Sequence, residues 1–128
     1  MDAAKTTNTD HTQIYNKLRN LSAKLIVEIP ETMAGFGQLH AAAVAPAALD
    51  TKTKELIALS IGIAVHCNGC IAFHVHDALQ AGANRQEILE TIGVAILMGG
   101  GPSMVYGCEA LEALEALNQF EVEQDLPL

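Results

Sequence analysis

Apolar residues recur along the chain at the three- and four-residue spacing of α-helices, and no run alternates apolar and polar residues as a half-buried strand does. The first helical run spans about residues 10–29. Asp10 is suited to cap this helix, and Pro30 ends it. One face of the run carries its apolar positions, Ile14, Leu18, Leu21 and Leu25. The pattern predicts an all-α protein.

Two further helical runs follow before the middle of the chain. The second, about residues 31–44, contains two glycines, each of which weakens a helix by about 1 kcal/mol relative to alanine. We expect its inward face to consist of Met33, Phe36, Leu39 and Ala43. The third, about residues 51–66, begins behind a capping Asp50 and is apolar around much of its circumference, so we expect a central, buried helix.

The second half of the chain predicts three more helices. The turn-prone Asn68–Gly69 pair marks the start of a fourth helix that ends at Gly82. Asn84 and Glu87 have the spacing of a capping box at the start of a fifth. The glycines at 99–101 end that helix in a tight turn, and a sixth follows through Leu117. We therefore expect one helical domain over residues 1–128, with loose ends at 1–9 and 121–128.

The composition indicates an assembly and excludes some partners. Half of the 128 residues are hydrophobic and only 17% are charged, which is little polar surface for a small domain that stands alone. We therefore predict a homo-oligomer in which apolar surface is buried between subunits. The 15 acidic and 7 basic residues give a net charge of −8, which disfavours nucleic acids and anionic membranes as partners.

The ends and the apolar runs suggest a location. The polar first residues contain no apolar segment of the kind found in a signal peptide. The longest apolar run, Leu56–Val65, has about half of the roughly 20 residues that a membrane helix needs. We expect a cytoplasmic protein. In a reducing cytosol, a Cys-x-x-Cys pair is more often redox-active or metal-binding than a structural disulfide.

The candidate chemistry is concentrated in the middle of the chain, where Cys67 and Cys70 form such a pair. A helix that begins near Cys67 presents free N–H groups and a positive dipole end, which favour a thiolate. The two cysteines are close enough on one helical turn to form a disulfide. His74 lies four residues after Cys70, on the same helical face, where it can exchange a proton with that thiol. These groups are the minimum for a dithiol peroxidase or disulfide reductase.

Other uses of the cysteine pair are open. Zinc could take both cysteines with two of His66, His74 and His76, but structural zinc sites usually draw on two separated ligand pairs. Haem attachment fails because Ile71 stands where a histidine is required, and a thioredoxin fold fails because no strands are predicted. We predict no cofactor and no bound metal.

The remaining candidate residues have ordinary interpretations. Glu55 is most simply a solvated acid that stabilises its own helix dipole. A straight helix would place it about 18 Å from Cys67, so it reaches the thiols only if the chain folds back or if another subunit supplies it. We interpret Cys108 as a packed small hydrophobe. His40 is expected at a helix surface or interface, His76 facing solvent or a partner, and His11 in the first capping region.

The run Glu55…Cys67-Asn-Gly-Cys70-Ile-Ala-Phe-His74 resembles the alkylhydroperoxidase D-like group of the carboxymuconolactone decarboxylase superfamily. The similarity covers about residues 30–117. It implies an all-helical domain that assembles as a homo-trimer or homo-hexamer. By this resemblance Cys70 is the thiol that attacks peroxide and Cys67 the resolving thiol, while His74 and Glu55 form the proton relay. Some members carry a histidine between the cysteines, where this chain has Asn68 and Gly69.

The resemblance implies a thiol-dependent peroxidase or disulfide reductase with an antioxidant role. Its partners would be a small-molecule hydroperoxide and an unidentified thiol reductant. Two alternatives remain: a non-catalytic or metal-binding helical scaffold, and a lactone decarboxylase-like enzyme in which the cysteines are incidental. The decarboxylase branch generally lacks the thiol pair, so its activity is not the one that this sequence suggests.

Overall fold

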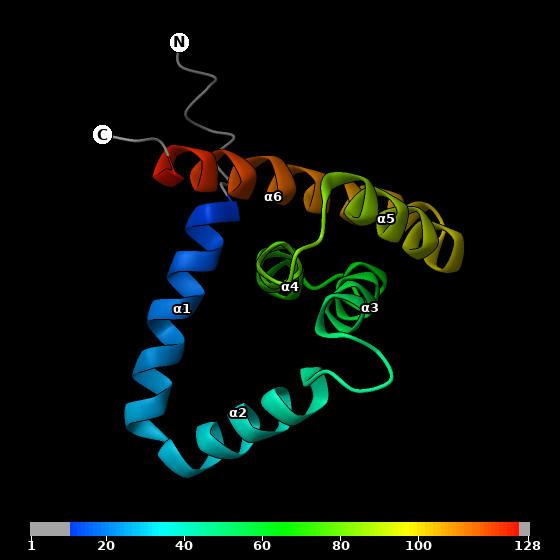
Figure 1. The fold of residues 1–128 in the computed structure, drawn as a ribbon. Coiled ribbons are helices and arrows are strands. Elements are labelled where there is room, and N and C mark those ends of the chain that lie inside the picture. Colours follow the sequence, from blue (N-terminus) through cyan, green and yellow to red (C-terminus); the bar gives the residue numbers. More distant parts are fainter. Residues whose placement is uncertain (1–10, 126–128) are drawn as a thin grey trace.

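Six helices account for nearly all of residues 11–125, the part of the chain that the computed structural model describes (Figure 1). In chain order they are α1 (His11–Glu28), α2 (Pro30–Val44), α3 (Thr51–Ala64), α4 (Asn68–Gln80), α5 (Arg85–Gly99) and α6 (Gly101–Asp125). No strand occurs among these residues. The predicted all-α fold is confirmed.

Side-chain hydrogen bonds cap the starts of α3 and α5, as the sequence predicted. The Asp50 carboxylate accepts a hydrogen bond of 2.7 Å from the Thr53 N–H at the start of α3. Asn84 and Glu87 form the predicted reciprocal capping box at the start of α5, with bonds of 2.8 and 3.0 Å. Between α5 and α6, Gly100 has a φ of +70°, a conformation that glycine adopts at little cost.

Helices α3 and α4 lie together at the centre of the molecule and are covered on one side by α5 and α6 (Figure 1). Helix α1 flanks α4 and α6, and α2 passes on the side of α3 and α4 away from α5. The buried apolar core draws on α3 to α6 and on the loop before α5. It comprises Leu59, Ile63, Ile71, Ala72, Val75, Ala78, Ala83, Ile88, Ile92, Ala95, Ala110, Ala113, Leu114 and Leu117.

The expected inward face of α2 is wrong for the single chain. Phe36 and Leu39 are 63% and 64% exposed, and no residue of α2 is buried. On α1, Leu21 and Leu25 are also exposed, although they share the predicted helical face. The cause is that helices α3 to α6 already enclose the core among themselves, so the apolar residues of α1 and α2 have little left to pack against.

The predicted ends need two adjustments. Helix α6 continues to Asp125, so residues 121–125 are helical and not part of a loose end. Glutamate and glutamine are good helix formers, and the first helix breaker in this region is Pro127. Helix α3 ends at Ala64, two residues earlier than expected. The predicted cap at Asp10 and the loose segments 1–9 and 126–128 lie outside the described residues.

Among helices α1 to α6, none has both the length and the apolar composition that crossing a bilayer requires.

Candidate active site

The two central helices approach each other closely at Gly62 of α3, which faces Cys70 of α4. A β-carbon at Gly62 would lie 3.1 Å from the Cys70 β-carbon, closer than nearly all such contacts. The turn between the helices is held by backbone hydrogen bonds from Val65 N–H to Ile61 O (2.9 Å) and from Cys67 N–H to Gly62 O (3.0 Å). The missing side chain at Gly62 therefore allows Cys70 to lie directly against α3.

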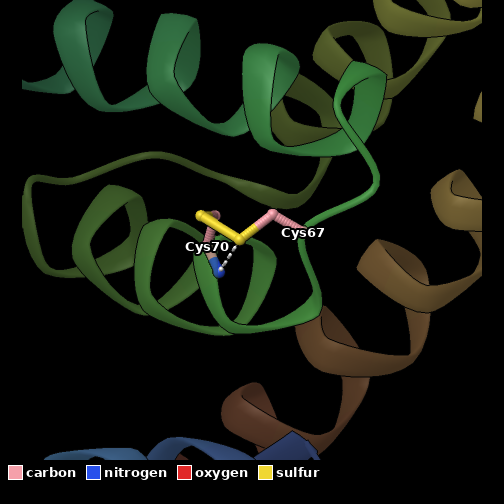
Figure 2. Close-up of a disulfide and its surroundings, with 2 residues drawn as sticks. All are labelled: Cys67 and Cys70. Atoms are coloured by element: carbon pink, nitrogen blue, oxygen red, sulfur yellow. Dashed lines mark hydrogen bonds between the residues drawn. A yellow bond between two sulfur atoms is a disulfide. The ribbon is translucent and has the colours of Figure 1, made fainter.

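Cys67 and Cys70 occupy the N-terminus of α4 and form a disulfide, with their α-carbons 5.2 Å apart (Figure 2). Cys67 is the residue that caps the helix, and its sulfur accepts a hydrogen bond of 3.2 Å from the Cys70 N–H. Cys70 follows within the first turn. Because this end of a helix attracts negative charge, it favours the thiolates that reduction of the disulfide would produce.

Glu55 lies in the site and is not the solvated acid that its sequence position suggested. Its side chain is buried, with the whole residue 2% exposed, and its Oε2 lies 2.7 Å from Nδ1 of His74. Helix α4 returns alongside α3, so these residues meet although 19 positions separate them. The alternative in which the chain folds back is the correct one, and no second subunit is needed to supply this carboxylate.

The pair can manage a proton beside the dithiol. When the Glu55 carboxylate is ionised, it accepts a hydrogen bond from Nδ1–H of His74, which leaves Nε2 as the basic ring nitrogen. His74 follows Cys70 by one turn of the same helix, so both side chains leave α4 on one face. The structure thus gathers Cys67, Cys70, His74 and Glu55 on two adjoining helices.

Two other histidines of this stretch pack against tyrosines. His66 is exposed, has a φ of +61° and stacks on Tyr106 of α6, with the ring centroids 4.6 Å apart. His76, which we expected to face solvent or a partner, is partly buried within the chain and stacks on Tyr15 of α1 at 4.4 Å. The His76 contact joins α1 to α4. Neither tyrosine could be identified from the sequence, because stacking partners far apart in the chain follow no spacing rule.

His40 is exposed on α2, as predicted, but it has acidic neighbours that the sequence did not reveal. One ligating atom each of His40, Glu55 and Asp77 lies within 4.8 Å of the other two. Asp77 was missed, although it follows His74 by three residues on α4 and so lies on nearly the same face. That spacing is the signal that could have identified it.

The remaining candidates lie outside the site. Cys108 is exposed on α6 in the single chain, so its interpretation as a packed residue is wrong. His11, the first residue of α1, is buried, with its Nε2 3.1 Å from Oε2 of Glu109. The orientation of these two groups does not make the contact a hydrogen bond.

Residues 30–113 match the model of the carboxymuconolactone decarboxylase family. The chain belongs to this family. An uncharacterized protein of Cupriavidus necator is 36% identical to it over 89 residues, which are 70% of this chain and 79% of the relative.

Crystal structures of family members have the same fold. A carboxymuconolactone decarboxylase family protein from Legionella pneumophila, solved in its apo form, superposes with a TM-score of 0.80 at 48% identity. The match covers 82% of this chain and 94% of that protein. A Thermotoga maritima family protein, described as a candidate for involvement in an antioxidative response, gives a TM-score of 0.77 at 28% identity, covering 88% and 96% of the two chains.

Proposed function

We propose that this family member is a dithiol oxidoreductase that reduces hydroperoxides through Cys67 and Cys70. The observation that carries the proposal is the contact between the buried Glu55 carboxylate and the partly buried His74, which lies one helical turn from Cys70. A carboxylate that orients an imidazole beside a nucleophile is the arrangement by which enzymes activate thiols and hydroxyls. The antioxidative description of the Thermotoga maritima protein points in the same direction.

The reaction follows from the placement of the four residues. His74 accepts the proton of the Cys70 thiol, and the thiolate attacks the peroxide O–O bond. One oxygen remains on Cys70 as a sulfenic acid, and the other leaves as an alkoxide, which takes the proton from His74 and becomes an alcohol. The Cys67 thiol then condenses with the sulfenic acid, which releases water and forms the disulfide seen here. Two electrons have passed from the dithiol to the peroxide.

An external dithiol must restore the pair by thiol–disulfide exchange. Its thiolate attacks one sulfur of the disulfide, and its second thiol resolves the mixed disulfide that results. The reductant leaves oxidised, and both cysteines return to the thiol form. We propose that this cycle operates in the cytoplasm, where reduced dithiols are available.

The first test compares the three cysteines. Consumption of an organic hydroperoxide is followed with excess dithiothreitol, and intact mass with peptide mapping identifies the oxidised residues. For the mass measurement the native protein is first reduced and freed of dithiothreitol, and it should then lose two hydrogens at Cys67 and Cys70 after one equivalent of peroxide. Cys70→Ser should abolish turnover, whereas Cys108→Ser, the matched control on α6, should retain it. Full activity in Cys70→Ser would end the proposal.

The second test addresses the proton relay. Glu55→Gln keeps a hydrogen-bond acceptor for His74 but removes the negative charge that stabilises the protonated imidazole. We expect peroxide turnover to fall by roughly 10- to 100-fold and its pH profile to shift. This loss is at or below the lower end of what removal of a general base costs, because His74 itself remains. Glu87→Gln, which removes a carboxylate outside the site, is the matched control. An unchanged rate and pH profile in Glu55→Gln would remove Glu55 from the mechanism.

We also propose that copies of this chain assemble as a trimer or hexamer. Large apolar side chains are exposed on several helices, and Val27 of α1 and Leu97 and Met98 of α5 are almost fully so. A water-exposed apolar surface of this kind is typical of one that another subunit covers. Light scattering should give a solution mass of three or six chains, and a mass of one chain would refute assembly.

A further inference from the structure

A cluster of three side chains on three different helices has the donors of a metal site. Each of His40 on α2, Glu55 on α3 and Asp77 on α4 offers one ligating atom, and these atoms lie within 4.8 Å of one another. The cluster is mixed, with one imidazole nitrogen and two carboxylate oxygens. We propose that His40, Glu55 and Asp77 bind a divalent cation of the zinc class.

The separations suit closure around one ion. Ligand atoms held at roughly 2.1 Å from a common ion lie roughly 3.0–3.4 Å apart in tetrahedral or adjacent octahedral positions. The ligating atoms now lie within 4.8 Å of one another. Any two of them therefore need to approach by roughly 1.8 Å at most to reach those separations. Glu55 is buried and fixed, whereas His40 is exposed and free to supply this movement by a change of rotamer. The exposed side of the cluster gives the ion a path from solvent.

The two carboxylates are already oriented by neighbours outside the ligand set. Nδ1 of His74 lies 2.7 Å from Glu55 Oε2, and Nδ1 of His76 lies 3.0 Å from Asp77 Oδ1. Each carboxylate has two oxygens, so one can stay with its histidine while the other binds the ion. Ligating groups in metal sites are commonly held in this way by hydrogen bonds from a surrounding shell.

The charges favour a cation at this position. Two carboxylates that lie so close together repel each other when both are ionised, the more so because Glu55 is withdrawn from water. A doubly charged ion between them would neutralise both. An imidazole with carboxylates suits zinc and similar transition metals, whereas magnesium prefers oxygen ligands alone and retains most of its water.

This site differs from the zinc site considered from the sequence, because it uses neither cysteine. It stands apart from the proposed peroxidase activity as well, although Glu55 belongs to both. The test therefore uses the oxidised protein in a Cys108→Ser background, in which no thiol remains to bind zinc. It measures binding and not turnover, so failure of the metal site and failure of the peroxidase proposal give separate results.

The experiment is calorimetric titration with zinc chloride, repeated with magnesium chloride. We expect one zinc ion per chain and much weaker binding of magnesium. His40→Ala and Asp77→Asn should each weaken zinc binding by at least roughly 10- to 100-fold. That is the loss that follows when a residue hydrogen-bonded to a metal ligand is removed, and these residues are proposed as ligands themselves. His66→Asn removes another exposed histidine and should leave zinc affinity unchanged. Asparagine is chosen because it tolerates the positive φ that His66 has.

A second readout follows from the position of His40. Because that ligand lies on the outer helix, zinc should link α2 to α3 and α4, slow hydrogen exchange of the α2 amides and raise the melting temperature. Both effects should be absent in His40→Ala. Because His40 is exposed, this substitution is not expected to disturb folding, so the loss of both effects would report the loss of a zinc ligand. Absence of zinc binding in the native chain, or equal affinity in His40→Ala and His66→Asn, would overturn the site.

Discussion

The central pair, α3 and α4, and the outer pair, α1 and α2, all carry apolar residues at helical spacing but lie in opposite environments. In the central pair, Leu59, Ile63 and Ile71 are completely buried, and the functional side chains lie beside them. In the outer pair, Phe36 and Leu39 are mostly exposed, and α2 buries no residue within the chain. Periodicity thus identifies a helix and its apolar face, but not what that face contacts.

The difference bears on how the site is built. Glu55 can be held 2.7 Å from His74 because its surroundings are tightly packed and leave it little freedom. The outer pair contributes His40 to the edge of the same cluster from a helix with few packing contacts. The central pair therefore fixes geometry, whereas the outer pair is available to respond to a ligand or another copy.

The largest predicted contrast comes from the same leucine deletion in both regions. Leu59→Ala removes a fully buried side chain and should lower the free energy of unfolding by about 2–5 kcal/mol. Leu39→Ala should change it by only about 0.5 kcal/mol, because that side chain is already 64% exposed. Denaturant unfolding at a series of protein concentrations, beginning with a low one, measures both.

A large loss in Leu39→Ala that grows with protein concentration would show that α2 is covered by another copy. A similar loss at every concentration would contradict the contrast between the two regions.

A smaller contrast is expected from a matched pair of glycines. At Gly62, the branched side chain of Gly62→Val would overlap Cys70 and should destabilise the protein by about 1–3 kcal/mol. At Gly37 of α2, no atom lies within 4 Å of an added β-carbon, so Gly37→Val should be neutral or slightly stabilising. Thermal unfolding compares the two, and peroxide reactivity reports the position of Cys70. Equal stability of the two variants would mean that α3 and α4 can separate without cost.

The smallest predicted effect is a loss of stability at low pH. It arises at the starts of α3 and α5, where Asp50 and Glu87 lie. A hydrogen bond from Lys52 holds the pKa of Glu87 below its usual value, and hydrogen bonding from Thr53 lowers the pKa of Asp50. A lowered pKa in the folded state gives stability that is complete above the ordinary carboxyl pKa and is lost as the pH falls through the folded value. We expect melting temperatures to fall below about pH 4.5.

Glu87→Gln should make that fall shallower, by a small amount because the Lys52–Glu87 pair is exposed and screened by salt. Melting curves between pH 3 and pH 7 at low salt measure the difference. Glu112→Gln, on an exposed part of α6, serves as the control. An identical slope for native protein and Glu87→Gln would show that this contact adds nothing to folding.

Much of the fold could be predicted because its signals are local. Pro30, Asp50 and the Asn84–Glu87 box act within one helical turn, so the sequence places those helix ends correctly. The same holds for Cys67, Cys70 and His74, which share one helix and therefore one face. Family resemblance added Glu55, which spacing alone could not bring to the thiols.

Six helices, the cysteine pair at a helix start and the spacing from Cys70 to His74 could all be predicted from the sequence. The packing of the helices was needed to show that Glu55 is buried against His74, that His40 and Asp77 lie beside it, and that α1 and α2 remain exposed. The two sets of features differ in the range of the interactions that produce them. Backbone hydrogen bonds and caps depend on residues within about four positions, whereas burial depends on which helices return to lie against each other.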